Sequence, residues 1–493
     1  MQKTRVRRAG ALVVGLTLVA AACGGSDDTA TPVTDPATAE TDMTETSTAS
    51  TDMTETTTAA TDMTEDTTAA TDMTEETTAD TTADSTAAPS GDVAGAMAGF
   101  KGTTPLVELA QDFKDRLATV PTGANLTDYN YAGETYDIFV ILALATEIAG
   151  TDGIDMAKEI QGVTRDGEKC TTYVDCLALV QAGTDIDYDG LSGEISLNGV
   201  GDPLSASYGV LTFGDDNRID DSLTEYIPAN APDVADVAPI EIVGAREGDG
   251  ILKVGGLLPE TGSLAFLGPP EIAAAELAVK EINEAGGVLG VPMEYLPGDS
   301  GDTSTDLASQ TVDKHLAANV DAIVGAASSS VSLTVVDKIT AAGVVEFSPA
   351  NTSDKFTTYD DKGLYFRVAP PDVLQGALVA ELVAGDGNGS AYILALDDAY
   401  GTGLADVVES ILTESGVTIL GKKIYDPKAA GFDAEVDEIK AADPDAIVLI
   451  TFDEGSRILR TMVEKGIGPK DKLVYGVDGN TGNALGENFD AGA

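Results

Sequence analysis

Hydrophobic and polar positions from residue 251 to residue 493 switch repeatedly between a two-residue and a helical period, which predicts strands that alternate with helices. The first unit is a strand at 251–258, followed by an amphipathic helix at 269–285 that ends at Gly286. The same pattern predicts further strands at 291–296, 321–324, 344–347 and 364–368, with helices at 305–318 and 329–342 between them.

Two prolines, Pro370 and Pro371, interrupt this pattern, and a second series follows them. Its predicted elements lie at 391–396, 403–415, 417–425, 434–441, 446–450, 457–465 and 473–477. Strands that alternate with helices form parallel sheets with helices on both faces. We therefore expect an α/β fold of two doubly wound parallel-sheet lobes joined by a hinge, with lobe 1 at about 251–369 and lobe 2 at about 370–493.

The upstream part of the chain, residues 93–214, has a different pattern. It predicts a strand at 100–103, helices at 107–117 and 131–149, and a strand pair at 191–197 and 205–213, whereas 215–250 is rich in Pro, Ala and Asp and is predicted to be a connector. We expect residues 483–493 to form a loop that continues, in the order of the fold, at 94–103. Residues 251–493 followed by 93–214 then make one domain, so the chain order is circularly permuted; an assembly or gene-model artefact would print the same order.

The N-terminus is predicted to be an export signal, residues 1–22, because basic residues precede an apolar run at 9–22 that is too short to span a membrane. The residues Ala20-Ala21-Ala22-Cys23-Gly24-Gly25 resemble a bacterial lipobox. This resemblance implies that Cys23 is diacylated, and two acyl chains suffice for stable anchoring. Ala20 stands where lipoboxes prefer Leu, so ordinary cleavage after an Ala-x-Ala site remains an alternative.

Residues 23–92 are predicted to be a lipidated cysteine followed by a disordered tether. The five-residue unit Thr-Asp-Met-Thr-Glu recurs from positions 41, 51, 61 and 71, and Thr, Ala and acidic residues fill the spaces between the units. These units have no apolar face to bury, so disorder is favoured over a repeat fold.

The formal net charge of −55 argues against nucleic acid and anionic lipid as partners, so the expected contact with the membrane is the lipid anchor alone. The chain has three cysteines. With Cys23 assigned to lipid, Cys170 and Cys176 remain as a disulfide pair in an exported protein, with free thiols as the alternative. Two thiolates without a nearby histidine fall short of a zinc site, and we expect no metal or cofactor.

Several short stretches together resemble the leucine/isoleucine/valine-binding branch of the type I periplasmic binding proteins. They are Gly255–Gly262, Ile282–Gly287, Val324–Ser330, Phe347–Thr352, Asp397–Gly403 and Gly476–Gly479, with Tyr131–Asp137 and Leu191–Gly193 upstream. Residues 93–214 resemble the part that normally ends the family's domain. The resemblance implies an extracytoplasmic, monomeric receptor that delivers a small amino acid-like ligand, such as a branched-chain amino acid or amide, to the permease of an ABC importer.

An amino acid zwitterion needs donors for its carboxylate and acceptors for its ammonium group. Ser328 and Ser329 lie where a strand gives way to a helix, a place where hydroxyls and free N–H groups converge. The resemblance to the family implies that Ser329, Ala350 and Thr352 bind the ligand's α-carboxylate and part of its ammonium group. In lobe 2, the family pattern places Tyr400 over the ligand, Asp478 on its ammonium group and Phe452 at an aromatic position that here lacks a hydroxyl. Phe266 and Leu267 are expected to line an apolar side-chain pocket.

Other classes of function predict different residues. A sensory lobe or a non-transport surface protein derived from such a receptor is the main alternative, because it keeps the fold. An enzyme requires a base or a metal set in the cleft, and His315, the one histidine, lies in the predicted helix 305–318 without a Ser/His/Asp arrangement. We therefore expect no catalytic residues.

Overall fold

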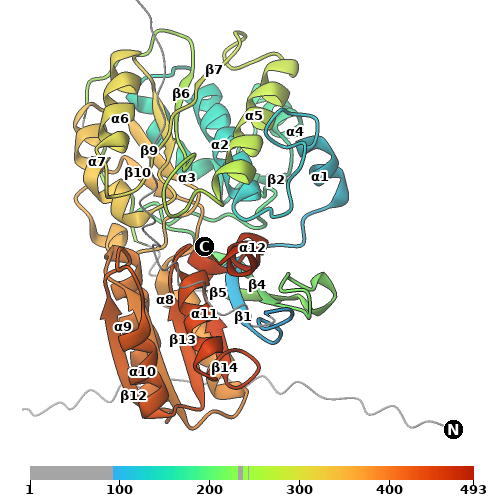
Figure 1. Cartoon of the computed structure of the whole chain (residues 1–493). Helices are drawn as coiled ribbons and strands as arrows, with labels where there is room; N and C mark the ends of the chain where they lie inside the picture. The colour runs from blue at the N-terminus through green and yellow to red at the C-terminus, as the bar shows by residue number, and fades with distance from the viewer. Residues whose placement is uncertain (1–92, 231–236, 243, 493) are drawn as a thin grey trace, which may run out of the picture. The chain divides into compact units, whose positions relative to one another are not determined.

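The computed structural model describes residues 93–230, 237–242 and 244–492 (Figure 1). The described residues all belong to one compact unit. The predicted export signal, Cys23 and the tether therefore lie outside the described residues.

Lobe 2 is built on a seven-stranded sheet to which both parts of the chain contribute. Its order is β12 (Thr418–Tyr425), β11 (Ser390–Leu396), β13 (Ala446–Ile450), β14 (Leu473–Gly476), β1 (Lys101–Pro105), β4 (Ser205–Thr212) and β5 (Glu225–Asn230). The strands from β12 to β1 are parallel to one another, whereas β4 runs antiparallel to β1 and β5 antiparallel to β4.

Lobe 1 contains a five-stranded sheet whose strands are all parallel. Its order is β10 (Tyr365–Arg367), β9 (Val345–Ser348), β8 (Ala322–Gly325), β6 (Lys253–Leu257) and β7 (Glu294–Leu296). These strands are short apolar runs because helices cover both faces of a parallel sheet. The α/β fold of two parallel-sheet lobes is therefore confirmed.

Helices of both chain parts surround these sheets. Lobe 2 carries α8 (Asp372–Gly385), α9 (Ala399–Glu414), α10 (Asp433–Ala442), α11 (Gly455–Glu464) and α12 (Asn483–Ala491). Lobe 1 carries α5 (Gly268–Glu284), α6 (Leu307–Ala317) and α7 (Ser329–Ala341), with α1 (Gln111–Leu117), α2 (Ala132–Ala149), α3 (Ile160–Val163) and α4 (Tyr173–Gln181) from upstream. Short 3₁₀ turns lie at η1 (Ile154–Lys158), η2 (Asp221–Leu223), η3 (Phe356–Thr358) and η4 (Asp478–Asn480).

The upstream part completes both lobes. In lobe 2, β1 lies between β14 and β4, with Lys101 opposite Tyr475 and Gly102 opposite Gly476. In lobe 1, α2 packs along α5, and Figure 1 shows these two helices side by side. Helix α2 is buried around almost its whole circumference, which explains why its sequence is apolar with little amphipathic pattern.

The chain passes between the lobes after β1, before β4, after β5 and after β10. A fully buried ion pair ties two of these crossings together, with Arg367 Nε 2.6 Å from Asp202 Oδ1. Arg367 also donates a 2.9 Å hydrogen bond from Nη1 to the carbonyl oxygen of Ser353. A buried ion pair is tolerated only when such additional hydrogen bonds satisfy the charges, so this pair holds the crossings in one geometry.

Two predictions about elements were wrong, and some elements were not predicted. Residues 191–197 make isolated bridges instead of a strand, because both edges of β4 are already taken by β1 and β5. The predicted connector, 215–250, contains β5. The predicted terminal loop is helix α12, whose Leu485 and Phe489 are buried on one face. Gly486 favoured a loop in the sequence, but it lies in the helix because an added Cβ there would lie 1.8 Å from the carbonyl oxygen of Asn217. Helix α8, which follows Pro371, was not predicted.

The predicted disulfide is present. It joins Cys170, at the end of β2 (Glu168–Cys170), to Cys176 in α4, with an S–S distance of 2.08 Å. Strand β2 pairs with β3 (Ile186–Tyr188) in a small separate sheet, so the bond closes a local loop beside α2.

Two glutamates are buried where α2 meets α5. Glu271 is fully buried and neither of its carboxylate oxygens has a hydrogen-bond partner; burial, with the nearby Glu134, raises its pKa well above the usual value. Burial, together with the Asp137 charge, raises the pKa of Glu134 from its usual value near 4.5 to about 8. These carboxyls are therefore favoured in their neutral form in the folded protein.

We expect Glu134→Gln to stabilise the folded protein increasingly as pH rises from about 4.5 to about 8. In the wild type the unfolded chain releases the Glu134 proton near the lower value and the folded chain near the higher one, so its stability falls across this window. Urea unfolding at several pH values measures the difference. The exposed change Asp112→Asn controls for the lost charge. Parallel wild-type and Glu134→Gln stability curves would contradict the prediction.

Candidate ligand-binding site

Lobe 1 presents polar groups where two neighbouring parallel strands end. Strand β8 leads to Ser328, which is the N-cap of α7 and whose side chain accepts a 3.4 Å hydrogen bond from the backbone N–H of Val331. Strand β9 leads to Ala350 and Thr352, which are both buried. Carboxyl ends of parallel strands meet at one edge of a sheet, which is why these residues converge with Ser329.

Side-chain hydrogen bonds fix the turn that contains Ala350 and Thr352. The Ser348 hydroxyl donates to the carbonyl oxygen of Ala326 (2.7 Å) and accepts from the N–H of Asn351 (2.9 Å). The Asn351 amide donates two 2.9 Å bonds to the carbonyl oxygens of Ala326 and Ala327. These hydrogen bonds join the two strand ends of lobe 1 to each other without a ligand.

Lobe 2 contributes a buried carboxylate and an aromatic pair. Asp478 opens the η4 turn directly beyond β14, and Tyr400 lies in the first turn of α9. The Tyr400 hydroxyl donates a 2.6 Å hydrogen bond to Asp478 Oδ1. The Phe452 ring stacks on the Tyr400 ring, with centroids 5.6 Å apart and planes 9° from parallel.

A second tyrosine, Tyr131, reaches the same carboxylate from the upstream part of the chain. Its hydroxyl donates a 2.6 Å hydrogen bond to Asp478 Oδ2. Tyr131 caps the start of α2 with a left-handed backbone (φ 60°), which is uncommon for a bulky residue and orients its ring toward lobe 2. Sequence reasoning assigned every cleft residue to 251–493, and Tyr131 corrects that assignment. Its motif, Tyr131–Asp137, was recognised, but nothing local in the motif indicates that Tyr131 reaches the cleft.

Asp478 is a buried acid whose hydrogen bonds offset much of the cost of burial. Burial raises its pKa, whereas the hydrogen bonds from Tyr131 and Tyr400 lower it. Burial, with the nearby Asp478 charge, raises the pKa of both tyrosines well above the usual value, so both remain donors. The arrangement presents one buried negative charge to the space between the lobes.

These groups surround a pocket of about 270 Å³ between the lobes. It is lined by Tyr131, Leu264, Leu267, Ala327, Ser328, Ser329, Ala350, Thr352, Tyr400, Phe452, Asp478 and Gly479. No lysine, arginine or histidine is among these lining residues, so the complementary ligand carries a positive group toward Asp478.

The structure thus brings Ser328, Ser329, Ala350, Thr352, Tyr400, Phe452 and Asp478 together around one pocket. Phe266 does not line it, contrary to prediction. Leu264 and Leu267 lie three residues apart in a turn closed by a 2.9 Å hydrogen bond and share its inner face, whereas Phe266 packs toward Gly482. His315 is buried in α6 with Nε2 2.8 Å from the Gly256 carbonyl oxygen, and it is not a lining residue.

A larger cavity of about 830 Å³ adjoins the pocket and shares Ser328 and Phe452 with it. Its lining includes Asp302, Asp397, Asp398, Asp426, Asp453 and Glu454, but only Lys428 and Arg457 carry positive charge. An acidic lining of this kind favours cationic over anionic molecules in the cavity.

Three comparisons place the chain among known proteins. Residues 251–493 match the family model described as periplasmic binding protein. Leu/Ile/Val-binding protein homolog 7 of Brucella suis is 26% identical over 251 residues, which cover 48% of this chain and 61% of that protein. Leu/Ile/Val-binding protein homolog 1 of the same organism is 29% identical over 261 residues, which cover 51% of this chain and 67% of that protein.

A solved structure of the branched-chain amino acid transporter substrate-binding protein LivJ from Streptococcus pneumoniae, in complex with isoleucine, is 29% identical. The match covers 49% of this chain and 68% of that one, with a TM-score of 0.44.

Residues 251–493 form an α/β segment that belongs, by this family match, to the type I periplasmic binding proteins, and the relatives it resembles are leucine/isoleucine/valine-binding homologues. The match spans about three fifths of the length of the first of these relatives. Among the described residues no helix is long and apolar enough to cross a membrane.

We expect Tyr131→Phe to lower the free energy of unfolding by about 1–3 kcal/mol at neutral pH, because Asp478 Oδ2 loses a donor while it stays buried. The loss should be smaller in acid, where Asp478 is protonated. Urea unfolding at both pH values measures the effect. Tyr295→Phe is the matched control, since it removes a buried hydroxyl that has no hydrogen-bond partner. Equal effects of the two changes would contradict the prediction.

Proposed function

We propose that this chain is the extracytoplasmic solute-binding protein of an ABC importer, in which two lobes close on a small amino acid-like ligand. The observation that carries the proposal is the pairing of a buried carboxylate, Asp478, in lobe 2 with hydroxyls and a helix N-terminus in lobe 1, around one small pocket. A zwitterion requires this separation of acceptors from donors. A receptor of this kind binds its ligand without catalysing a reaction.

In this proposal the ligand carboxylate lies near Ser329, Ala350 and Thr352. The N-terminus of α7 supports the carboxylate because its first N–H groups and the helix dipole favour negative charge. Asp478 accepts hydrogen bonds from the ammonium group, with Tyr131 and Tyr400 on either side of it. Leu264, Leu267 and Phe452 contact the apolar side chain, which favours a branched-chain amino acid or its amide.

Affinity in such a clamp comes from contacts that exist only when both lobes meet the ligand. An exported location is part of the proposal, with residues 1–22 as the signal and Cys23 as the diacylated anchor to the outer face of the cytoplasmic membrane. The disulfide between Cys170 and Cys176 supports an oxidising compartment. The permease of the importer is the proposed protein partner, and the receptor is proposed to act as a monomer.

We also propose that residues 93–214 are the C-terminal part of the family's domain in circularly permuted order. The parallel pairing of β1 with β14 supports this, because β1 continues the order of the lobe 2 sheet where the matched segment stops. The side-chain amide of Asn217 donates to both the Val93 carbonyl oxygen (2.9 Å) and Asp490 Oδ1 (2.7 Å), so the segments to be joined already lie together.

We expect at least one α-amino ligand to raise the melting temperature of the wild type when amino acids, their amides and short-chain acids are screened by thermal shift and calorimetry. Matched acids that lack the amino group should bind far more weakly, because they leave Asp478 without a partner. A folded sample with no response across this panel would favour a non-transport surface protein instead.

We expect Asp478→Asn to weaken binding of an amine ligand by about 10- to 150-fold, since a charge-assisted hydrogen bond in a dry cleft contributes about 1.5–3 kcal/mol. Isothermal titration with the best ligand of the panel measures the change, and Asp112→Asn on the exposed face of α1 is the control. Unchanged affinity in Asp478→Asn would remove Asp478 from the site.

We expect mass spectrometry of the native protein to yield the tryptic peptide 219–246, which joins the β4–β5 hairpin to the segment before β6. This peptide, together with peptides from a second protease that span the Arg218–Ile219 and Arg246–Glu247 bonds, establishes that residues 93–214 precede residues 251–493 in the protein itself. Its absence, with good coverage on both sides, would mean that the permuted order is an artefact.

A further inference from the structure

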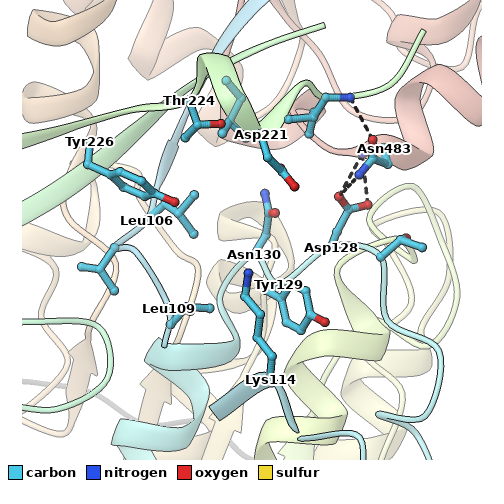
Figure 2. A pocket seen from close by; sticks show the side chains of 14 residues that line it. Leu106, Leu109, Lys114, Asp128, Tyr129, Asn130, Asp221, Thr224, Tyr226 and Asn483 are labelled. Atoms are coloured by element: carbon cyan, nitrogen blue, oxygen red, sulfur yellow. Dashed lines mark hydrogen bonds between the residues drawn. The ribbon is translucent and has the colours of Figure 1, made fainter. Parts of the chain in front are cut away.

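Helix α12 begins without a cap of its own. Its N-cap residue is Gly482, which has no side chain to accept a hydrogen bond from the first turn. The carboxylate of Asp128 takes this role. It accepts from the backbone N–H of Asn483, with distances of 3.1 and 3.0 Å to its two oxygens, and from Asn483 Nδ2 at 2.9 Å (Figure 2). Asp128 lies 355 residues away in the chain, so the cap is long-range.

Asp128 belongs to lobe 1, whereas α12 belongs to lobe 2. The loop that carries Asp128 is held on α5 by Thr122, whose hydroxyl donates a 3.1 Å bond to Glu276 Oε1. The neighbouring Tyr129 packs on the core of α2 and α5 and lies under the ammonium group of Lys114, 4.7 Å from the ring centre. On the other side, α12 packs on α11. The hydrogen bonds of Asp128 therefore cross the boundary between the lobes.

A second exchange of helix-cap groups crosses the same boundary beside Ser329 and Tyr400. Ser330, in the first turn of α7, donates a 3.1 Å hydrogen bond to Asp398 Oδ2 and accepts one of 2.9 Å from the N–H of Ala399. Asp398 is the N-cap of α9. Two helices of lobe 2, α9 and α12, therefore have first-turn N–H groups that are satisfied by side chains of lobe 1.

We propose that Asp128 is a positioning residue that sets ligand affinity without contacting the ligand, by capping α12 only when the two lobes are closed. The inference rests on the proposed function, because it assigns Asp128 to the closing step of that receptor. Opening the lobes returns the first N–H groups of α12 to water, so the cap favours the closed state. A ligand that binds the closed state then binds more tightly by the same factor.

Asp128 lies at the boundary between the lobes and not in the ligand pocket, and Figure 2 shows it among the residues of a second pocket. It lies at a separate cavity of about 500 Å³, lined by Lys114 and Tyr129 of lobe 1 and by Asp221 and Tyr226 of the β4–β5 hairpin in lobe 2. This cavity shares no lining residue with the ligand pocket. Substitution of Asp128 therefore leaves the ligand contacts in place.

The test compares the full chain carrying Asp128→Ala, Asp128→Asn or Asp445→Ala with the wild type. The side chain introduced by Asp128→Asn still offers an acceptor oxygen, so this change is the conservative rescue. Asp445 accepts a 3.1 Å bond from the N–H of Gly389 and a 2.9 Å bond from the Ser390 hydroxyl, wholly within lobe 2, so Asp445→Ala is the matched control. Calorimetry and stopped-flow kinetics use L-leucine, L-isoleucine and L-valine, and hydrogen exchange is followed with and without them.

Asp128→Ala should weaken binding of all three amino acids by a common factor of about 5- to 30-fold, the range expected for a lost cap, through faster dissociation. Amide exchange should accelerate around Asn483 and also around Ala399, because both caps open together. Asp128→Asn should retain most of the affinity, and Asp445→Ala should match the wild type.

Faster exchange around Asn483 alone, with unchanged affinity, would overturn the proposal and make Asp128 a local cap. If the wild type binds none of the three amino acids, their transport role fails. Amide hydrogen exchange in ligand-free Asp128→Ala then tests the role of Asp128 separately. Faster exchange at both Asn483 and Ala399 supports a cap that links the lobes, and faster exchange at Asn483 alone overturns it.

Discussion

The insertion of β1 between β14 and β4 is the constraint on which the rest of the molecule depends. This one strand pairs on one side with the end of the matched segment, through Lys101 and Tyr475, and on the other side with its own upstream part. Once β1 is in the sheet, the chain that leaves it must cross to lobe 1, where α2 packs on α5. Tyr131, at the start of α2, is thereby carried to Asp478. The strand that completes the lobe 2 sheet therefore also leads the chain that brings Tyr131 to the pocket.

Three polar interactions join distant parts of the fold across a boundary between the lobes or between the two parts of the chain. Arg367 and Asp202 join two crossings, Asp478 receives hydroxyls from both parts of the chain, and Asp128 caps a helix of the opposite lobe. Each interaction is costly unless every partner is in place, because an unpaired buried charge is far less stable than a paired one. Such groups therefore favour one relative position of the crossings and lobes over others. Apolar packing alone specifies this position less sharply.

The alternation of strands and helices between residues 251 and 477 was predictable because parallel sheets leave a strong periodic signal. The position of Ser328, Ala350 and Asp478 near one another was also predictable, since each follows the carboxyl end of a strand. The predictions were wrong where tertiary contacts decide whether a segment is a strand, a loop or a helix. Residues 191–197 alternate like a strand, but both edges of β4 are taken by β1 and β5. Residues 483–491 contain a glycine but form a helix because Leu485 and Phe489 are buried.

The sequence by itself determined the fold class, the two lobes and the strand ends that carry the polar groups, because periodicity and local motifs depend on near neighbours. The resemblance of residues 93–214 to the end of the family's domain also predicted that they build one domain with residues 251–493. Only the tertiary structure decided that Tyr131 shares Asp478 with Tyr400, that Leu264 and not Phe266 lines the pocket, and that Asp128 caps α12. These contacts join residues hundreds of positions apart, and no local pattern encodes the distance or direction between them.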